Sequence, residues 1–508
     1  MFHVPLYLEG LRSRPLLVFW LATLAQAVLW TLVPLLFYAA PPAELARVLA
    51  IGHEFPLHGD FGPPLAYWLA EIAFRAAGLF GVYALSQICV IATYWCVFAL
   101  GRSIIGATHA AMAVLLMVGI SVFAVPTPNF GPPILALALW AAMLLFYWRA
   151  VGEGRRHYWY ALGGAAALLL ITTSGALILI AALALFTALS ARGRAAAGAA
   201  EPWIAMAALI GVLCLHVFWL ERAGTGLTPA LGRLRGAGMA GANSAAWLRL
   251  VAGLLVAHAG LAVLVVLASG WPRIRLGPAP VIAHAPVAAP AVTFVKAFAL
   301  VPALLATIVA VLAGDLLPIG GAAPLLVLSG LAVIIAAGDT FELHHQRILG
   351  FAWAGLLVVP AIFIPAVIGL LPWVTGTELK VALPAKAMGS FFADNFARRT
   401  GHSLAVVSGD DQIAELIALA APSRPSVYFA AEPEHSPWVT AQDIREKGAV
   451  IVWPALDTNP APPPDIKAHF PDLIPEVPRT FARPVRGRLP PLLIGWGVIR
   501  PASAPAAH

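Results

Sequence analysis

Charged residues are scarce in this chain of 508 residues, because Asp, Glu, Lys and Arg together make up only 11% of it. Roughly a quarter of an ordinary soluble domain is charged. Hydrophobic residues reach 61%, and no water-soluble fold covers that much apolar surface. The composition therefore predicts an integral membrane protein. The net charge of +7 does not indicate a nucleic-acid partner, because most arginines lie in short loops between apolar runs, where they set orientation in the membrane.

Cysteine is equally scarce. Cys89, Cys96 and Cys214 all lie within apolar runs, so we interpret them as small core residues that form no metal motif and indicate no redox compartment. The first apolar run, 15–40, is longer than a signal-peptide core and has no convincing small-residue cleavage site. It is therefore predicted to be a retained membrane helix.

Apolar runs long enough to cross a bilayer recur along residues 1–375 and predict an all-α membrane domain of about eleven transmembrane helices. The runs are 15–40, 81–101, 106–125, 130–150, 157–173, 174–191, 203–220, 247–270, 292–313, 321–338 and 348–373. Under strict alternation most loop arginines, from Arg12 to Arg347, fall on one face, which predicts a cytoplasmic N-terminus. An odd number of spans places the C-terminus on the opposite side.

The first outer loop, 41–80, contains two short amphipathic patterns. Leu45, Val48 and Leu49 repeat at helical spacing, as do Leu65, Trp68, Leu69 and Ile72. Such helices lie in a membrane interface with their apolar faces down. The loop is therefore predicted to hold interfacial helices.

Residues 376–508 have the composition of a soluble domain, and helical and strand patterns alternate there, which predicts a small C-terminal α/β domain. The predicted elements are helices over 384–399, from Asp410 and over 440–447, strands over 403–408, 426–430 and 449–453, and a closing hairpin of 481–485 with 492–499. Asp410 precedes a helix and is predicted to cap it. The Pro-rich stretch 459–464 is expected to be a loop.

Ionisable residues are unusually dense in the loop 41–80. Glu44 and Asp60 are the carboxylates that two adjacent interfacial helices would bring together, and either is a candidate catalytic base. The alternative is that both are solvated loop charges. His53, Glu54 and His58 are weak candidates for a divalent metal, because their residue types suit such ions but their spacing matches no established motif.

The order of several short motifs resembles the GT-C glycosyltransferases of the protein-mannosyltransferase-like and bacterial galacturonosyltransferase-like groups. The motifs are Ala43-Glu44, Asp60-Phe-Gly-Pro63-Pro64-Leu65 with Trp68, Trp140, Gly154–Trp159 with Gly163, His216-Val-Phe-Trp219-Leu220 and Thr228-Pro229. Ala43 stands where members of the family commonly carry the first acid of an Asp-Glu pair. The base role therefore passes to Glu44 or Asp60, or the activity is altered or lost.

The resemblance implies transfer of a sugar from a polyprenyl-phosphate carrier to a lipid, glycan or protein acceptor, with inversion and no certain cofactor. Cations must receive the phosphate, and the outer-loop arginines Arg222, Arg233 and Arg235 break the positive-inside pattern. Their alternative role is contact with anionic lipid headgroups. His216, Trp219, Pro63, Pro64 and Trp68 are further substrate-binding candidates. The expected location is the bacterial inner membrane, with the C-terminal domain in the periplasm.

Two other functions remain open from the sequence. A transporter or flippase would carry charged residues inside its spans, and these apolar runs contain almost none. A catalytically silent scaffold is compatible with Ala43. The C-terminal domain is expected to recognise the acceptor, alongside the loops 41–80 and 221–246.

Overall fold

The computed structural model describes residues 4–57, 61–222, 240–271, 279–313, 323–432, 435–485 and 487–502. The chain divides into two compact units. The helical unit comprises Met1–Leu32 and Tyr83–Ile362, and the sheet unit comprises Val33–Val82 and Phe363–His508. The sheet unit thus joins the first outer loop to the C-terminal part of the chain. The boundary at residue 375 stays a prediction.

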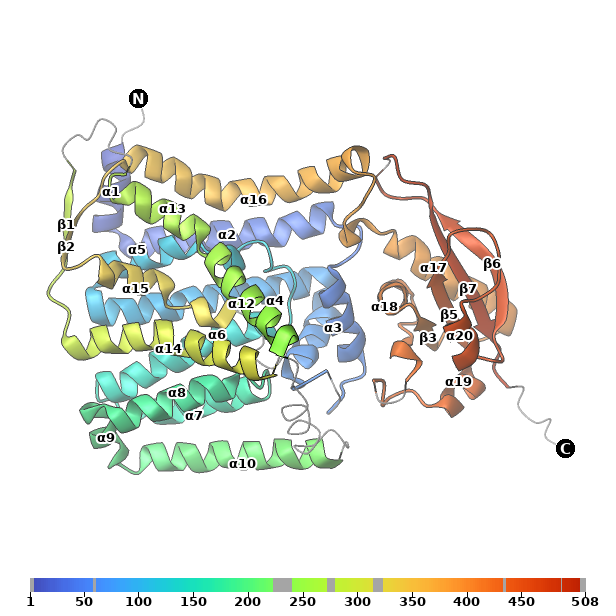
Figure 1. Ribbon diagram of the computed structural model, residues 1–508, viewed down its shortest axis with the longest axis horizontal. Coiled ribbons are helices and arrows are strands. Elements are labelled where there is room, and N and C mark those ends of the chain that lie inside the picture. The colour runs from blue at the N-terminus through green and yellow to red at the C-terminus, as the bar shows by residue number, and fades with distance from the viewer. Residues whose placement is uncertain are drawn as a thin grey trace. The chain divides into compact units, whose positions relative to one another are not determined.

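The helical unit is built from apolar helices, several of which run side by side, as α6, α7 and α8 do (Figure 1). Its helices, of which α2, α4 and α16 extend into the sheet unit, are α1 (Val4–Ser13), α2 (Pro15–Phe37), α4 (Leu65–Ile105), α5 (Ala107–Met117), α6 (Pro132–Tyr147), α7 (Tyr158–Leu170), α8 (Ala176–Leu189), α9 (Ala191–Ala197), α10 (Glu201–Arg222), α12 (Ala240–Ala257), α13 (Ala259–Ala268), α14 (Ala289–Ala313), α15 (Ser329–Ala336) and α16 (Gln346–Val374). A π-helical turn, Trp148–Gly152, extends α6, and β1 (Val281–Ala283) pairs antiparallel with β2 (Thr340–Glu342).

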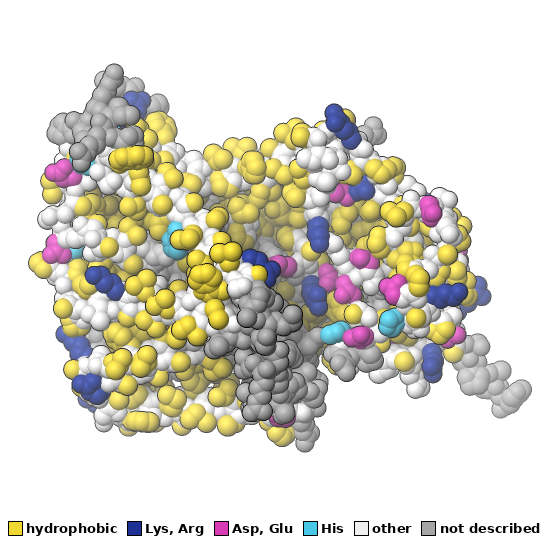
Figure 2. All heavy atoms as spheres, in the orientation of Figure 1, with side chains coloured by type: hydrophobic (Ala, Val, Ile, Leu, Met, Phe, Trp, Pro, Cys, Tyr) yellow, Lys and Arg dark blue, Asp and Glu magenta, His cyan; other side chains and the backbone are white. Residues whose placement is uncertain are grey.

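Five helices in the described part of the chain are long and apolar enough to cross a membrane, and two bent helix pairs raise the number to at most seven. Every predicted run coincides with an apolar helical segment, but four of these segments are only 10–17 residues long. Multiple membrane-spanning helices are therefore confirmed, whereas the count of eleven is not. On the face in Figure 2, hydrophobic side chains cover the helical unit, while acidic and basic side chains are concentrated on the sheet unit.

Small residues and a few polar pairs hold the helical unit together. A Cβ atom at Gly330 of α15 would lie 2.2 Å from the carbonyl oxygen of Ala113 in α5, so these helices pack backbone to backbone. Tyr94 donates to Oε1 of Gln26 at 3.1 Å, and Nε2 of His258 lies 2.8 Å from the hydroxyl of Ser329. Close small-residue contacts and interhelical hydrogen bonds are the interactions that join helices where lipid removes the hydrophobic drive.

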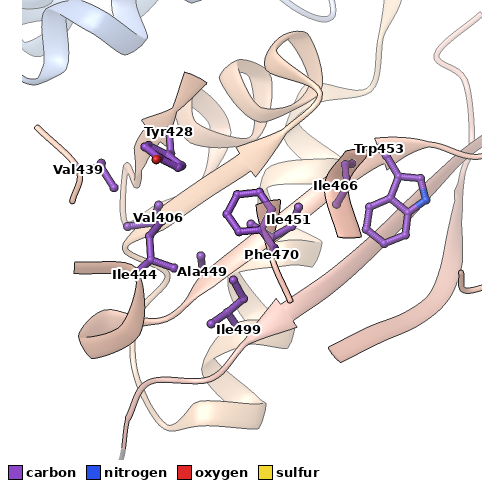
Figure 3. Close-up of a cluster of buried hydrophobic side chains, with 10 residues drawn as sticks. All are labelled: Val406, Tyr428, Val439, Ile444, Ala449, Ile451, Trp453, Ile466, Phe470 and Ile499. Atoms are coloured by element: carbon purple, nitrogen blue, oxygen red, sulfur yellow. The ribbon is translucent and has the colours of Figure 1, made fainter. Parts of the chain in front are cut away.

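The sheet unit contains a five-stranded mixed sheet of order β4-β3-β5-β7-β6. Its strands are β3 (Val406–Gly409), β4 (Ser426–Tyr428), β5 (Ala449–Pro454), β6 (Ile474–Phe481) and β7 (Leu492–Ile499), and its helices are α17 (Ala385–Thr400), α18 (Asp411–Ala420), α19 (Ala441–Lys447) and α20 (Pro464–His469). The strand β3 pairs parallel with β4 and β5, and β7 pairs antiparallel with β5 and β6. Figure 3 shows a core cluster in which Tyr428, Ile451, Trp453 and Phe470 are buried.

The predicted C-terminal α/β domain is confirmed, including the cap. Asp410 accepts a hydrogen bond from the backbone N–H of Ile413 and so begins α18. The predicted position of the first strand of the closing hairpin, 481–485, is wrong, because β6 is Ile474–Phe481. Pro475 and Pro478 argue against a strand, but β6 is an edge strand with β7 as its one neighbour, so missing N–H donors are tolerated.

The first outer loop forms two helices within the sheet unit, as its apolar spacing predicts. Helix α3 (Ala43–His53) packs against α18 and β4, and the guanidinium carbon of Arg47 lies 5.3 Å from the ring centre of Phe429. Helix α4 begins at Leu65 and breaks at Ala77 and Gly78, where φ is −150° and +61°. The loop 41–80 therefore lies beside the C-terminal domain, as expected. The interfacial position of these helices stays a prediction.

Candidate functional site

The structure locates one of the two predicted catalytic carboxylates. Glu44 lies in the first turn of α3 with an exposed side chain. Asp60 and His58 lie outside the described residues, as do Arg233 and Arg235. Arg222, His216 and Trp219 belong to α10, but their side chains also lie outside the description. The grouping of Glu44 with Asp60 and of the outer-loop arginines therefore stays a prediction.

Pro63 and Pro64 belong to the connection between α3 and α4, and Trp68 lies in the first turn of α4. The indole N–H of Trp68 donates to the carbonyl of Pro56 at 2.9 Å, and the backbone N–H of Trp68 donates to Pro64 at 3.1 Å. The hydroxyl of Tyr67 donates to the carbonyl of Phe61 at 2.8 Å. The first turn of α4 thus holds the connection at Pro56, near its beginning, and at Phe61. Trp68 has this anchoring role, and its role in substrate binding stays a prediction.

A buried carboxylate next to this connection has two arginines and a histidine as neighbours. The side chain of Glu71 in α4 is 2% exposed. Its Oε1 atom accepts from Nε of Arg75 at 2.8 Å and from Nδ1 of His53 at 3.2 Å, and its Oε2 accepts from Nη2 of Arg424 at 2.8 Å. We call Glu71, His53, Arg75 and Arg424 the Glu71 cluster. Residues of the first outer loop and of the C-terminal domain meet in it.

Both arginines of the Glu71 cluster also stack on aromatic rings. The guanidinium carbon of Arg424 lies 4.5 Å from the ring centre of Phe74, and that of Arg75 lies 4.9 Å from the ring centre of Phe55. Stacking of this kind fixes the plane of a guanidinium and adds about 0.5–1 kcal/mol at a partly exposed position. The two arginine side chains are therefore oriented by ring stacking as well as by their ion pairs with Glu71.

Two buried polar atoms near the Glu71 cluster have no hydrogen-bond partner within the described ranges: Oε1 of Glu54 and Nη1 of Arg424. Burial lowers the pKa of Arg424 from its ordinary value, while the negative charges of Glu71 and Glu54 oppose that change. An unpaired buried donor on an arginine is costly, which makes it a place where a polar group of a ligand or a water molecule binds favourably.

A metal centre finds no support in the described ranges, where no group of three or more His, Cys, Asp or Glu residues is arranged to hold an ion. His53 instead bonds to Glu71, and Glu54 lies near Arg424. Because His58 lies outside the description, the weak metal assignment of His53, Glu54 and His58 stays a prediction.

A second buried carboxyl, Glu415 in α18, lies on the helix that packs against α3. Burial raises the pKa of Glu415 to about 8, although the positive charges of Arg47 and Lys380 oppose the change. Asp411 and Asp410 add to the increase, because like charges disfavour ionisation. Glu415 therefore keeps its proton at neutral pH, whereas Glu71 is surrounded by cations that favour its charged form.

The arrangement separates two kinds of carboxylate. Both carboxylate oxygens of Glu71 are paired with arginines, and the side chain is almost fully buried. Glu71 is therefore suited to holding neighbouring groups in place rather than to accepting a proton from a substrate. Glu44, in contrast, has an exposed side chain. Sequence reasoning missed the Glu71 cluster. The spacing of Glu71 and Arg75, four positions apart on an amphipathic helix, was the available signal.

One family model matches part of the chain, and solved structures are similar to its fold. The family described as dolichyl-phosphate-mannose-protein mannosyltransferase matches residues 62–219. The chain is similar in structure to ArnT from Cupriavidus metallidurans bound to undecaprenyl phosphate, with a TM-score of 0.54, 13% sequence identity, and coverage of 94% of this chain and 97% of that one.

A weaker structural similarity is to the apo oligosaccharyltransferase of Archaeoglobus fulgidus, with a TM-score of 0.41, 14% identity, and coverage of 86% of this chain and 69% of that one. No curated protein matches the chain. The similarity to ArnT extends over nearly the whole of both chains and therefore includes the helical unit and the sheet unit.

Proposed function

We propose that this chain, a member of the GT-C superfamily of membrane glycosyltransferases, transfers a sugar from a polyprenyl-phosphate carrier to a lipid, glycan or protein acceptor. The observation that supports this most is the fold similarity to ArnT, which was solved with undecaprenyl phosphate and is covered over 97% of its length. The match of residues 62–219 to a mannosyltransferase family that is named for its dolichyl-phosphate donor supports the same kind of donor.

The chemistry requires little beyond a base and cations. A sugar on a polyprenyl phosphate is activated, because phosphate is a good leaving group, so a carboxylate must remove the proton of the acceptor hydroxyl while cations receive the phosphate. Glu44 or Asp60 is the base in this proposal, and a single direct displacement inverts the anomeric carbon. Arg222, Arg233 and Arg235 are the proposed phosphate ligands. Arg75, whose side chain is 56% exposed, offers a further guanidinium beside the connection between α3 and α4.

The proposed location is the bacterial inner membrane, with the N-terminus in the cytoplasm and the sheet unit in the periplasm, where an acceptor of the cell envelope such as lipopolysaccharide is available. A reporter fused after residue 508 tests the orientation. A reporter signal from the cytoplasm would refute both the proposed topology and the proposed periplasmic side of the reaction.

The activity is tested with the full chain in proteoliposomes that contain a radiolabelled polyprenyl-phosphate sugar and membrane-extract acceptors. We compare wild type with Glu44→Gln and Asp60→Asn, and with Glu446→Gln as a matched control on α19. Loss of a general base lowers the rate by roughly 10²–10⁴-fold, and we expect that loss in one of the first two variants only. Unchanged transfer in both would refute the site assignment.

The same vesicles decide between the enzyme and its alternatives. Movement of a lipid-linked substrate across the bilayer, with no transfer from any donor, would support a transporter or flippase. If the vesicles show no sugar transfer and no movement of the lipid-linked substrate, the result would support the silent scaffold that Ala43 suggests. Product analysis by nuclear magnetic resonance tests the inverting mechanism, and a product that retains the donor's anomeric configuration would contradict it.

A further inference from the structure

We propose that Arg424 is a positioning residue of the transferase site, so that the C-terminal domain completes this site instead of merely accompanying it. The role rests on the transfer activity proposed above. Arg424 lies in the segment between α18 and β4 and contacts Glu71 of the first outer loop, 353 positions away in the sequence. Both residues belong to the sheet unit.

The backbone at Arg424 is strained. Its φ is +49°, in the left-handed region that favours glycine, and the next residue is Pro425, which restricts the preceding residue further. Such a conformation costs on the order of 1–3 kcal/mol. Glycine would adopt it with less strain, so the arginine is explained by what its side chain does. That side chain bonds to Glu71, stacks on Phe74, and is only 18% exposed.

Glu71 depends on Arg424 for one of its two oxygens. Oε1 has His53 and Arg75 as donors, whereas Arg424 is the donor found for Oε2 in the described ranges. Without Arg424, a nearly fully buried carboxylate oxygen would lose its partner, and the carboxylate would rotate toward the remaining donors. His53, which Glu71 holds, is the last residue of α3.

The connection between α3 and α4 begins directly after His53. Glu54 follows it, the indole N–H of Trp68 holds Pro56 near the start of the connection, and the hydroxyl of Tyr67 holds Phe61 further on. Arg424, through Glu71 and His53, holds the end of α3, the helix that carries the candidate base Glu44. Displacement of a reacting group by about 1 Å can lower a rate about 10²-fold without a comparable loss of substrate binding. We expect loss of Arg424 to lower kcat much more than it raises KM.

Three substitutions separate the effect of the guanidinium group from the effect of the strained backbone. Arg424→Ala removes the side chain and keeps the strain, Arg424→Gly removes both, and Arg424→Lys keeps the charge but loses the planar fork that stacks on Phe74. Lys447→Ala, which breaks an exposed ion pair with Asp443 in the same domain, is the matched control. Each full-length variant is assayed in the proteoliposomes for kcat and KM, and its melting temperature is measured in the same detergent.

We expect the Ala and Gly variants to lose about 10²-fold in kcat equally, with KM changed by less than about threefold. The Gly variant should nevertheless melt at a higher temperature than the Ala variant, because glycine relieves the positive φ. The Lys variant should recover part of kcat, and the control should match wild type. A Gly variant as active as wild type, or activity that follows melting temperature across the series, would overturn the positioning role.

Hydrogen exchange gives a readout that does not need activity. The amides of Glu54, Phe55 and Leu57 should exchange faster in the Ala and Gly variants than in wild type and in Lys447→Ala. If wild type transfers no sugar, the proposed function fails, while this exchange measurement still shows whether Arg424 holds the connection. If wild type is active and neither kcat nor exchange changes in the variants, the positioning role alone fails.

Discussion

Glu71→Gln is the sharpest test of what holds the first outer loop to the C-terminal domain. The substitution keeps the shape of the side chain but removes a charge that is 2% exposed and faces Arg424, which is 18% exposed. Removing one partner of a buried ion pair costs about 3–5 kcal/mol, because the other charge is left without compensation. The Arg75 contact adds little, because that side chain is 56% exposed and solvent screens it.

Since glutamine can still accept one of the hydrogen bonds, we expect a loss at the lower end of this range, about 3 kcal/mol of unfolding free energy. Removing both charges, in Glu71→Gln with Arg424→Met, should destabilise by less than the sum of the single changes, with a coupling of about 2 kcal/mol. Denaturant unfolding of the full chain in detergent micelles measures all four corners of this cycle, with tryptophan fluorescence as the signal.

Two results would refute the reasoning. A loss below about 1 kcal/mol in Glu71→Gln would mean that water screens the pair as it does at a surface. Additivity of the two single changes to within about 0.5 kcal/mol would mean that Glu71 and Arg424 do not depend on each other.

The other predictions concern the sheet unit. Because Glu415 has a folded pKa of about 8 against 4.5 ordinarily, the folded protein holds a proton that the unfolded chain releases, so stability should fall as pH rises between these values, by at most about 1.4 kcal/mol per pH unit. Glu415→Gln should flatten this dependence in melting curves, and an unchanged slope would contradict it. Gly409→Ala should cost on the order of 3 kcal/mol or more, because φ is +112° and the new Cβ would lie 2.0 Å from the carbonyl oxygen of Val452. Gly401→Ala, with φ of +74° but open space around it, should cost only about 1 kcal/mol, and equal melting temperatures for the two would count against the steric argument.

The candidate site was predictable only where it depends on local pattern. The helix that carries Glu44 and the helix that begins at Leu65 follow from apolar residues at helical spacing, and both form. The substrate-binding role of Trp68 stays a prediction, and its hydrogen bond to Pro56 gives it an anchoring role that spacing does not reveal. Glu71 was missed because, within its own helix, it is an ordinary charge four positions before Arg75.

The sequence by itself determined that the chain is a helical membrane protein with a C-terminal α/β domain. The apolar helices, the strand over 492–499 and the cap at Asp410 are each encoded by residues that are neighbours in the sequence, and these elements are present in the structure. The tertiary structure alone decided that β6 tolerates two prolines, because it is an edge strand with one neighbour.

Tertiary structure also decided that Arg424 meets Glu71 across 353 positions of sequence. No periodicity encodes such a pairing, because its energy comes from burying two opposite charges together. That burial exists only after α3, α4 and the sheet have packed.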